Sequence, residues 1–406
     1  MGELVKVKGN QELVRQINQS LILDAIRRYG AISRAEIARV TGLTTGTLSN
    51  LTAGLIASGL VKEVGLGTSS GGRRPTMLQL EASARHTLGI SLAIDYVTCL
   101  LLDLTAQPVI RRSAPLGDDK SPGTCADLIA DLAREVLAAA GMKAEELLGV
   151  AVAIPGTVNA EEGLVIYSPN LKWHNVLFGP MLEDRLGVRP LLENDANAAV
   201  FGEYWCGATK DSSYSVFIFA DYGIGSGFVI NGEVYRGRDR AAGEFGHMTI
   251  DVHGLQCHCG NRGCLGMMAS GKAIVRRVRE AMDAGTPIPA LAGRASGEVR
   301  LQDVLQAARE GDPTCLRIIR EAGEYLGVGI ANLINLYNPA SLVLGGMLAL
   351  EAPGYWEAAA ESASQRLYPV FQNQVHLLLS TLGPDVPAIG AGSLVISQLF
   401  RPLRVQ

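Results

Sequence analysis

Four side chains that suit a soft metal ion lie within eighteen residues of the sequence. They are His247, Cys257, Cys259 and Cys264. Zinc takes four tetrahedral ligands from thiolates and imidazoles, and glycines at 260 and 263 allow the tight turns that would bring these side chains together. The sequence therefore predicts a structural Zn²⁺ site whose four ligands leave no position for a catalytic water. His253 and His258 are the alternative imidazoles, and His258, between two of the cysteines, is expected to point away.

The other four cysteines stand singly among apolar residues, without the paired pattern of a disulfide framework. The first ten residues contain no apolar signal core, and the most apolar segment, 88–104, is interrupted by Asp95 and Asp103. We therefore expect a protein of the reducing cytoplasm that is not inserted into a membrane.

Formal charge is distributed unevenly along the 406 residues. The whole chain carries −4, whereas residues 1–80 hold ten Lys or Arg against five acids, a charge of +5, which leaves −9 for the rest. A basic head on an acidic body predicts that the head binds a polyanion, because cationic surfaces attract nucleic acids. The length allows two or three domains.

The basic head shows the signals of three short helices. Apolar residues recur with helical spacing from 17 to 26, and Tyr29-Gly30 ends that helix. Ser33 with Glu36 forms a capping box for a second helix, and Thr44 can cap a third after a glycine-containing turn. This order predicts a helix-turn-helix whose third helix presents short polar side chains to the major groove of DNA. These side chains are Thr45, Thr47, Ser49 and Asn50.

Two short strands, 60–64 and 76–80, follow the third helix and enclose the flexible tip 68–75. The tip contains Arg73 and Arg74, which we expect to enter a minor groove or to contact phosphates. Together these signals predict an N-terminal winged helix-turn-helix, all-α apart from its wing, that binds DNA. The alternative is an ordinary three-helix module whose basic residues form a solvated face.

From about residue 84 the pattern changes to strands that alternate with helices, which is typical of an α/β domain. Segments 88–94 and 97–104 are expected to pair as a hairpin, and a second hairpin of this kind is expected across 215–230. Two lobes with related openings are therefore predicted. We expect a DNA-binding domain at 1–82, a first lobe at 83–200 completed by a C-terminal helix at about 385–406, and a second lobe at 201–384 with the zinc loop and a dimerisation surface.

Three consecutive motifs make the relation to known proteins specific. Residues 223–227 read Gly-Ile-Gly-Ser-Gly, 243–247 read Gly-Glu-Phe-Gly-His, and 257–264 read Cys-His-Cys-Gly-Asn-Arg-Gly-Cys. In these motifs the body resembles the ROK family of bacterial sugar kinases and sugar-responsive repressors, and the head indicates the repressor branch, of the Mlc and NagC type. The resemblance covers essentially the whole chain. It implies an actin-like, ribonuclease-H-like fold of two lobes with a sugar in the cleft between them, and it implies homodimers or larger assemblies such as tetramers.

The resemblance also implies which residues contact the sugar. Asn170 matches a sugar-contacting position of the family, as do Asn194 and Asp195 in Glu-Asn-Asp-Ala-Asn. In the kinases this aspartate accepts the proton of the attacked sugar hydroxyl, so Asp195 keeps the residue type of a general base. Glu244 and His247 match two further sugar-contacting positions, and His247 also serves the metal. The structural alternative for Asn194 and Asp195 is that they only cap the helix that follows.

Two departures from the family pattern bear on the function. Where the kinases have an Asp-x-Gly-Gly-Thr type turn that holds ATP phosphates, residues 91–95 read Ser-Leu-Ala-Ile-Asp, which removes both glycines and ends in an acid that repels phosphate. Phosphoryl transfer depends on positioning and charge neutralisation, so we expect no kinase activity and no catalytic residues. Where the family commonly has Gly-Cys-Leu-Glu, with the glutamate at the anomeric end of the sugar, this sequence has Gly266. We therefore expect an effector substituted at its anomeric carbon, with a neighbouring side chain or a water as the alternative partner for a free hydroxyl.

The sequence as a whole predicts a DNA-binding transcriptional regulator that represses carbohydrate uptake or catabolism genes. We expect its sugar effector in the interlobe cleft and its head on an inverted-repeat operator. Two alternatives stay open: a sugar kinase with a fused regulatory head, and a repressor inactivated by a transporter protein in place of a free sugar. The identity of the sugar does not follow from these residues.

Overall fold

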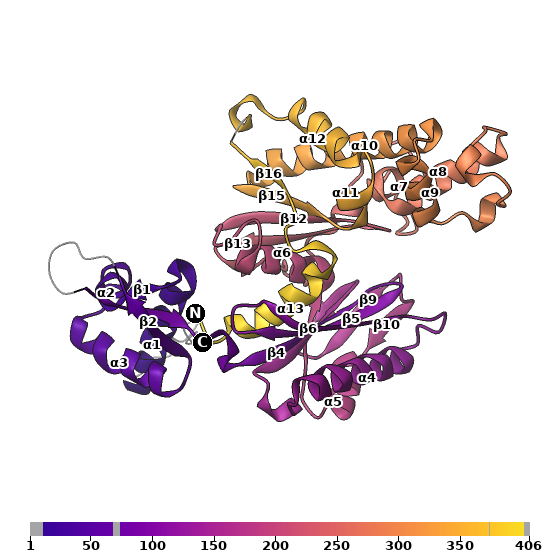
Figure 1. Ribbon diagram of the computed structural model, residues 1–406. Helices are drawn as coiled ribbons and strands as arrows, with labels where there is room; N and C mark the ends of the chain where they lie inside the picture. Colours follow the sequence, from indigo (N-terminus) through magenta and orange to yellow (C-terminus); the bar gives the residue numbers. More distant parts are fainter. Residues whose placement is uncertain (1–10, 68–73, 373, 402–406) are drawn as a thin grey trace, which may run out of the picture.

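The computed structural model describes residues 11–67, 74–372 and 374–401 of the chain. Figure 1 shows a helical head beside a body of two lobes, with the C-terminal helix lying between the lobes. This is the predicted architecture, a winged head followed by a two-lobed α/β body. Within the described residues, no helix combines the length and the apolarity needed to cross a membrane.

The head forms where local signals specify it. Its elements are α1 (Gln11–Tyr29), β1 (Ile32–Ser33), α2 (Arg34–Thr41), α3 (Thr45–Ala57), β2 (Val61–Leu66) and β3 (Thr76–Leu80), with the strands in the order β1-β3-β2. The Ser33 hydroxyl accepts a hydrogen bond from the Glu36 amide at 3.3 Å, and the Glu36 carboxylate accepts one from the Ser33 amide at 3.0 Å, which is the predicted capping box. Gly42 ends α2 in the left-handed region, and the Thr44 hydroxyl caps α3.

The first lobe is built on a five-stranded mixed sheet with a small antiparallel sheet beside it. Its elements are β4 (His86–Leu92), β5 (Tyr96–Asp103), β6 (Pro108–Pro115), α4 (Pro122–Ala140), β7 (Gly149–Ile154), β8 (Thr157–Asn159), β9 (Leu164–Ser168), β10 (Trp173–Val176), α5 (Phe178–Leu186) and β11 (Leu191–Asn194). The large sheet has the order β11-β7-β4-β5-β6. Alternate side chains of β4 face opposite layers, so Leu88, Ile90 and Leu92 pack in one core with α4, while Gly89 lies against the C-terminal helix α13 (Val386–Ser397).

The second lobe repeats this plan with a second five-stranded sheet. Its elements are β12 (Tyr214–Ala220), β13 (Ile224–Ile230), β14 (Glu233–Val234), α7 (Gly266–Ala269), α8 (Gly271–Asp283), α9 (Leu301–Arg309), α10 (Pro313–Tyr337), β15 (Ser341–Gly345), α11 (Met347–Glu351), α12 (Tyr355–Ser364) and β16 (His376–Leu379). The strand order is β14-β13-β12-β15-β16. Val216, Ile218 and Leu342 face α8, α9 and α10, whereas Phe217 and Val343 face the opposite layer.

Two helices cross between the lobes (Figure 1). Helix α6 (Asp195–Cys206) packs on β12 and β13 of the second sheet, and α13 packs on β4 and β7 of the first. A Cβ at Gly390 would overlap the Ala198 carbonyl oxygen, so the close crossing requires glycine there, and a Cβ at Gly202 would lie only 3.1 Å from the Gly390 Cα, so the crossing favours glycine at that position too. The boundary expected at residue 200 falls inside α6, and the division of the body into 83–200 and 201–384 stays a prediction.

The head and the body share one apolar core. Leu78 of the wing belongs to the same cluster of buried side chains as Leu102 and Leu104 of the first lobe and Trp205 of α6. The Leu104 amide also donates a hydrogen bond to the Ala82 carbonyl at 2.9 Å, just after the wing. The head is therefore packed onto the body and shares buried side chains with it.

Candidate functional site

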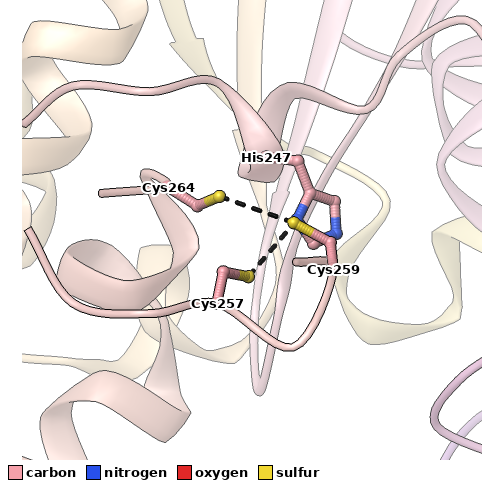
Figure 2. Close-up of side chains that lie close together, drawn as sticks. All are labelled: His247, Cys257, Cys259 and Cys264. Carbon is pink, nitrogen blue, oxygen red and sulfur yellow. Dashed lines mark hydrogen bonds between the residues drawn. The ribbon is translucent and has the colours of Figure 1, made fainter. Parts of the chain in front are cut away.

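The four predicted metal ligands come together in one loop (Figure 2). His247 ends the short helix η3 (Phe245–His247), and the loop that carries the three cysteines folds back onto it. The candidate ligand atoms all lie within 4.8 Å of one another. The Sγ atoms of Cys259 and Cys264 are 3.7 Å apart, and the Cys257 Sγ is 3.6 Å from the His247 Nδ1. A tetrahedral ion with zinc–sulfur bonds of about 2.3 Å needs sulfur–sulfur edges of about 3.8 Å and sulfur–nitrogen edges of about 3.6 Å, so this cluster can hold a metal ion of that size.

The backbone around the cluster explains how the loop closes. Isolated bridges pair Thr249 with Cys264 and Gln256 with Arg262. Gly263 has a φ of 65°, and a Cβ there would overlap the Asp251 carbonyl oxygen, so the predicted turn at this position requires glycine.

His258 and His253, the alternative imidazole ligands, lie in different places relative to the cysteines. His258 Nδ1 lies 3.7 Å from the Cys257 Sγ, so its ring does not point fully away, although it falls outside the four-residue ligand group. The His253 amide donates to the Asp251 carboxylate, and His253 is also outside the group. The group that could hold a metal ion thus contains His247 and neither of the other two imidazoles, and the choice of His247 as the fourth ligand stays a prediction.

Asp195 is the first residue of α6, and its carboxyl group has a perturbed pKa. Its pKa is raised to about 6, chiefly by desolvation and to a smaller extent by the nearby Asp221 and Glu244 carboxylates, while the hydrogen bond from the Ala196 amide at 2.8 Å acts in the opposite direction. Glu244 is exposed, and among the described residues its carboxylate has no hydrogen-bond or ion-pair partner. The structure thus places two of the predicted sugar residues, Asp195 and Glu244, close to each other with their carboxylates available to a ligand.

Asn194 caps the helix that follows it, which is the structural alternative that the sequence left open for this residue. Its Oδ1 accepts a hydrogen bond from the Asn197 amide at 3.0 Å as the N-cap of α6, and its Nδ2 donates to the Gly156 carbonyl at 2.9 Å. Both polar groups of this side chain are therefore engaged by the protein.

Glu193, beside this cap, is a buried carboxylate that sequence reasoning missed. Its oxygens accept hydrogen bonds from the Arg236 Nε at 2.9 Å, the Asn197 Nδ2 at 3.1 Å and the Asn194 amide at 3.1 Å. A charge at the end of an otherwise apolar strand was the available signal. Glu193 holds the start of α6, and with it Asp195, in position.

Asn170 meets a second residue that sequence reasoning missed. The Asn170 Oδ1 accepts a hydrogen bond from the Lys272 Nζ at 3.0 Å, which joins the loop between β9 and β10 to α8 of the other lobe. Lys272 also lies over the Tyr222 ring, with its Nζ 5.4 Å from the ring centroid. Asn170 and Lys272 both line a hollow of about 430 Å³, which is within the size range of small-molecule sites.

The predicted DNA-contacting face of α3 is largely exposed. Thr45, Ser49 and Asn50 are exposed, whereas Thr47 is half-buried with its hydroxyl 3.0 Å from that of Thr44. The Ser49 hydroxyl donates to the Thr45 carbonyl at 2.9 Å, and Asn50 is the longest polar side chain of this face that has no partner within the described part of the chain. Arg74 is exposed, and the prediction for Arg73 lies outside the described residues.

Comparison with known proteins assigns both parts of the chain. Residues 87–398 match the ROK family. The chain belongs to the ROK family. Residues 15–74, in the head of this ROK protein, match the MarR family.

Relatives of this ROK protein match it over nearly its whole length. It is 32% identical over 392 residues to the xylose repressor of Bacillus spizizenii, covering 97% of this chain and 98% of that protein. It is 30% identical over 401 residues to the DNA-binding transcriptional dual regulator NagC of Escherichia coli, covering 98% of this chain and 97% of that protein. A crystal structure of a ROK family transcriptional regulator, a homologue of the E. coli MLC protein, superposes with a TM-score of 0.80 at 28% identity, covering 96% of this chain and 97% of that chain.

Each of the two turns that the sequence comparison with ROK kinases singled out carries an acid in this structure. Asp95 lies in the turn between β4 and β5, and Asp221 lies in the turn between β12 and β13. Burial raises the pKa of Asp221, and the Asp95 carboxylate is near enough to raise it further. The amides of Gly271 and Lys272 donate to the carbonyls of Asp221 and Tyr222 at 2.9 and 3.2 Å, so the N-terminus of α8 is occupied by the turn itself.

Proposed function

We propose that this ROK protein is a transcriptional repressor of carbohydrate uptake or catabolism genes, controlled by a sugar that binds between its lobes. The observation that carries the proposal is the packing of a basic winged helix-turn-helix onto a ROK body within one chain. Two relatives, named a repressor and a DNA-binding regulator, match this chain with the head included. A repressor acts where its operator lies, so we place the protein in the cytoplasm.

The proposed binding residues are those that match the family's sugar-contacting positions and those predicted for the DNA-contacting face and wing. The sugar would contact residues on both sides of the cleft, which are Asn170, Asn194, Asp195, Glu244 and His247. Carboxylates and carboxamides suit this task because sugar hydroxyls both donate and accept hydrogen bonds. The operator would contact the face of α3 and the wing through Thr45, Thr47, Ser49, Asn50, Arg73 and Arg74.

We propose Zn²⁺ as the structural ion of the cysteine cluster. Three thiolates and one imidazole suit zinc, and the spacing of the ligand atoms supports a closed tetrahedral site. The ion would supply cross-links that hold the loop and fix the ring of His247. Because Nδ1 of His247 is the nitrogen that faces Cys257, Nε2 is the nitrogen left for a sugar hydroxyl.

An inverted-repeat operator needs two heads, so we propose a homodimer that can assemble further into a tetramer. Exposed apolar side chains near the end of α10 support a contact between copies. They are Leu336, Tyr337, Tyr368 and Val370. Apolar groups gathered on one surface favour association because water is released from them.

Helix α6 offers a route from the sugar cleft to the head. It begins at Asp195 and ends beside Arg27 of α1. The Arg27 guanidinium lies 4.1 Å from the centre of the Trp205 ring, donates to the Trp205 carbonyl at 3.4 Å and pairs with Asp211 at 2.6 Å. The Arg27 side chain is only 7% exposed, so these contacts are well shielded from solvent. A sugar that moves α6 would therefore shift the head through Arg27.

Changing Arg27 to Met tests this route. The variant should bind the sugar but lose most of the sugar's effect on operator affinity, because the hydrogen bond, ion pair and ring contact of Arg27 at the end of α6 are removed while the shared apolar core stays. Arg15→Met, which removes the same charge from an exposed position on the same helix, is the matched control. Equal coupling in the two variants, measured by fluorescence anisotropy of labelled operator with and without sugar, would exclude Arg27 from the route.

A sugar kinase with a fused head is the second candidate, and the phosphate turns argue against it. Asp95 and Asp221 place two acids where ATP phosphates would need cations or free amides. We expect no sugar-dependent ATP hydrolysis. Sugar phosphorylation that is abolished by Asp195→Asn would establish the kinase instead.

The proposed function is tested by selecting an operator from genomic fragments and titrating it with the full chain, with and without a panel of sugars. At least one sugar should weaken operator binding, and Asn50→Ala should change which fragments are selected. Sequence-specific DNA binding that no sugar alters, but that a transporter protein abolishes, would instead support a repressor that is inactivated by a transporter protein in place of a free sugar. Absence of sequence-specific DNA binding would refute the proposal.

A further inference from the structure

The hollow beside Asn170 is lined by basic side chains and by no acidic one. It lies between the two lobes, with one wall from β9, β10 and the loop between them and the other from the cysteine loop and α8. Its lining includes Lys172 and Lys272, the imidazoles of His174 and His258, and the aromatic ring of Tyr167, with no carboxylate. Small-molecule sites combine apolar area with a few convergent polar groups in this way.

The two lysines lining the hollow have no carboxylate partner among the described residues. The Cys257 thiolate is a negative group that acts on Lys272. A neighbouring hollow on the other side of Lys272 provides the contrast, because Arg276 is paired there with Glu280 at 2.8 Å. Lys272 donates to Asn170 at 3.0 Å, and an ammonium group has three hydrogens, so further donors remain for a ligand.

The acids of the cleft lie elsewhere. Asp221 and Glu244 both act electrostatically on Asp195, none of the three lines the hollow, and a sugar hydroxyl can donate to their carboxylates. Position 266 adds no acid, because the sequence has glycine there. The three acids suit sugar hydroxyls, whereas the lysine-lined hollow, which the predicted sugar contact Asn170 also lines, suits a negative charge.

We propose that Lys172 and Lys272 form a subsite for an anionic group, a carboxylate or a phosphate, carried on the effector sugar. The proposal rests on the proposed function, because it assigns the class of effector for the same cleft. An effector with this group spans both lobes, since Lys172 belongs to the first and Lys272 to the second. Hydrogen bonds between an ammonium and an anion are about twice as strong as neutral ones, so the subsite would discriminate anionic from neutral sugars.

The test is calorimetry on the full, zinc-loaded chain with matched sugars. Each ring is offered as the neutral sugar, the uronate, the 1-phosphate and the 6-phosphate, with inorganic phosphate alone as a further probe. At least one anionic derivative should bind about tenfold or more tighter than its neutral sugar, a difference of about 1.4 kcal/mol. The preference should fall as salt is raised, because the lysines are partly exposed.

Variants separate the subsite from a general effect on the cleft. Lys272→Met and Lys172→Met should each remove most of the anionic preference, whereas Lys272→Arg should retain part of it. Lys143→Met, at an exposed position in the first lobe, is the matched control for loss of one positive charge and should keep the preference.

Two results would overturn the subsite. One is a neutral sugar that binds as tightly as all of its anionic derivatives and still releases operator, which leaves the proposed function intact. The other is an equal loss of neutral and anionic binding in Lys272→Met, which would give this lysine a structural role only. If no sugar of either charge binds, the subsite and the proposed function both fall.

Discussion

Replacement of Asp195 by Asn distinguishes a residue kept for a ligand from a residue kept for the fold. The folded protein raises the pKa of this carboxyl from 3.8 to about 6, chiefly through desolvation. Each unit of pKa corresponds to about 1.4 kcal/mol, so the ionised carboxylate costs the folded state up to about 3 kcal/mol at neutral pH. The side chain is only half-buried, and solvent screening reduces the expected gain from Asn to about 1–2 kcal/mol.

The pH dependence gives the sign of the effect. A carboxyl with a raised pKa stabilises the folded state fully below its unfolded pKa, and that contribution is lost as the pH rises through the folded pKa. The parent should therefore be less stable than Asp195→Asn above about pH 6, and the difference should shrink toward zero near pH 3.8. Asn keeps an oxygen to accept the Ala196 amide, so the hydrogen bond at the start of α6 persists.

Hydrogen exchange of the amides in α6 measures this without requiring the whole chain to unfold in one step. At pH about 7.5 the α6 amides of the variant should be protected from exchange about 5- to 30-fold more than those of the parent, which corresponds to about 1–2 kcal/mol. At about pH 5 this ratio of protection factors should be smaller. Sugar binding should be lost in the same variant. Asn194→Ala is the comparison, because removal of the N-cap should lower protection by about 1 kcal/mol at both pH values. Lower protection in Asp195→Asn, or a gain that does not depend on pH, would refute the reasoning.

Three further predictions concern the metal, the wing and the effector. Cys259→Ser should release the metal ion and lower both thermal stability and operator affinity, because metal binding is part of the folding free energy; stoichiometric metal in the folded variant would contradict the ligand set. Arg74→Ala should flatten the dependence of operator affinity on salt by about one unit of log–log slope, since one phosphate contact fewer releases fewer counterions, and an unchanged slope would remove Arg74 from the interface. A sugar substituted at its anomeric carbon should bind at least as tightly as the free sugar because Gly266 offers no carboxylate there, and calorimetry that shows clearly tighter binding of the free sugar would sink that idea.

The head was predictable because its signals are local. Ser33, Glu36 and Thr44 act on amides within three residues of themselves, so their capping roles can be deduced without knowledge of the fold. The metal loop was predictable for a related reason, since three of its ligands lie close together in the sequence. The choice between His247 and His258 was harder, because both Nδ1 atoms lie near the Cys257 Sγ, at 3.6 and 3.7 Å.

Contacts between distant segments could not be deduced in the same way. Lys272 and Asn170 are 102 positions apart, and Arg27 and Asp211 are 184 apart, so neither pair has a sequence pattern of its own. Their proximity depends on how the lobes and the head pack. The resemblance to ROK proteins supplied the lobes and the cleft, but it carried over only motif residues, and Lys272 and Glu193 lay outside those we had assigned a role.

The arrangement limits how strongly a sugar can act on the operator. A hundredfold loss of operator affinity requires about 2.7 kcal/mol of difference between the sugar's affinities for the two arrangements of the head. Asp195 opens α6 and Glu244 precedes η3, and both of these elements pack on β13, so a sugar that touches only these two carboxylates gains little from moving the lobes. A sugar that also reaches Asn170 and Lys272 contacts both lobes, and its affinity then depends on their separation. The hydrogen bond between Asn170 and Lys272 is therefore the contact at which sugar binding and lobe position are most directly linked.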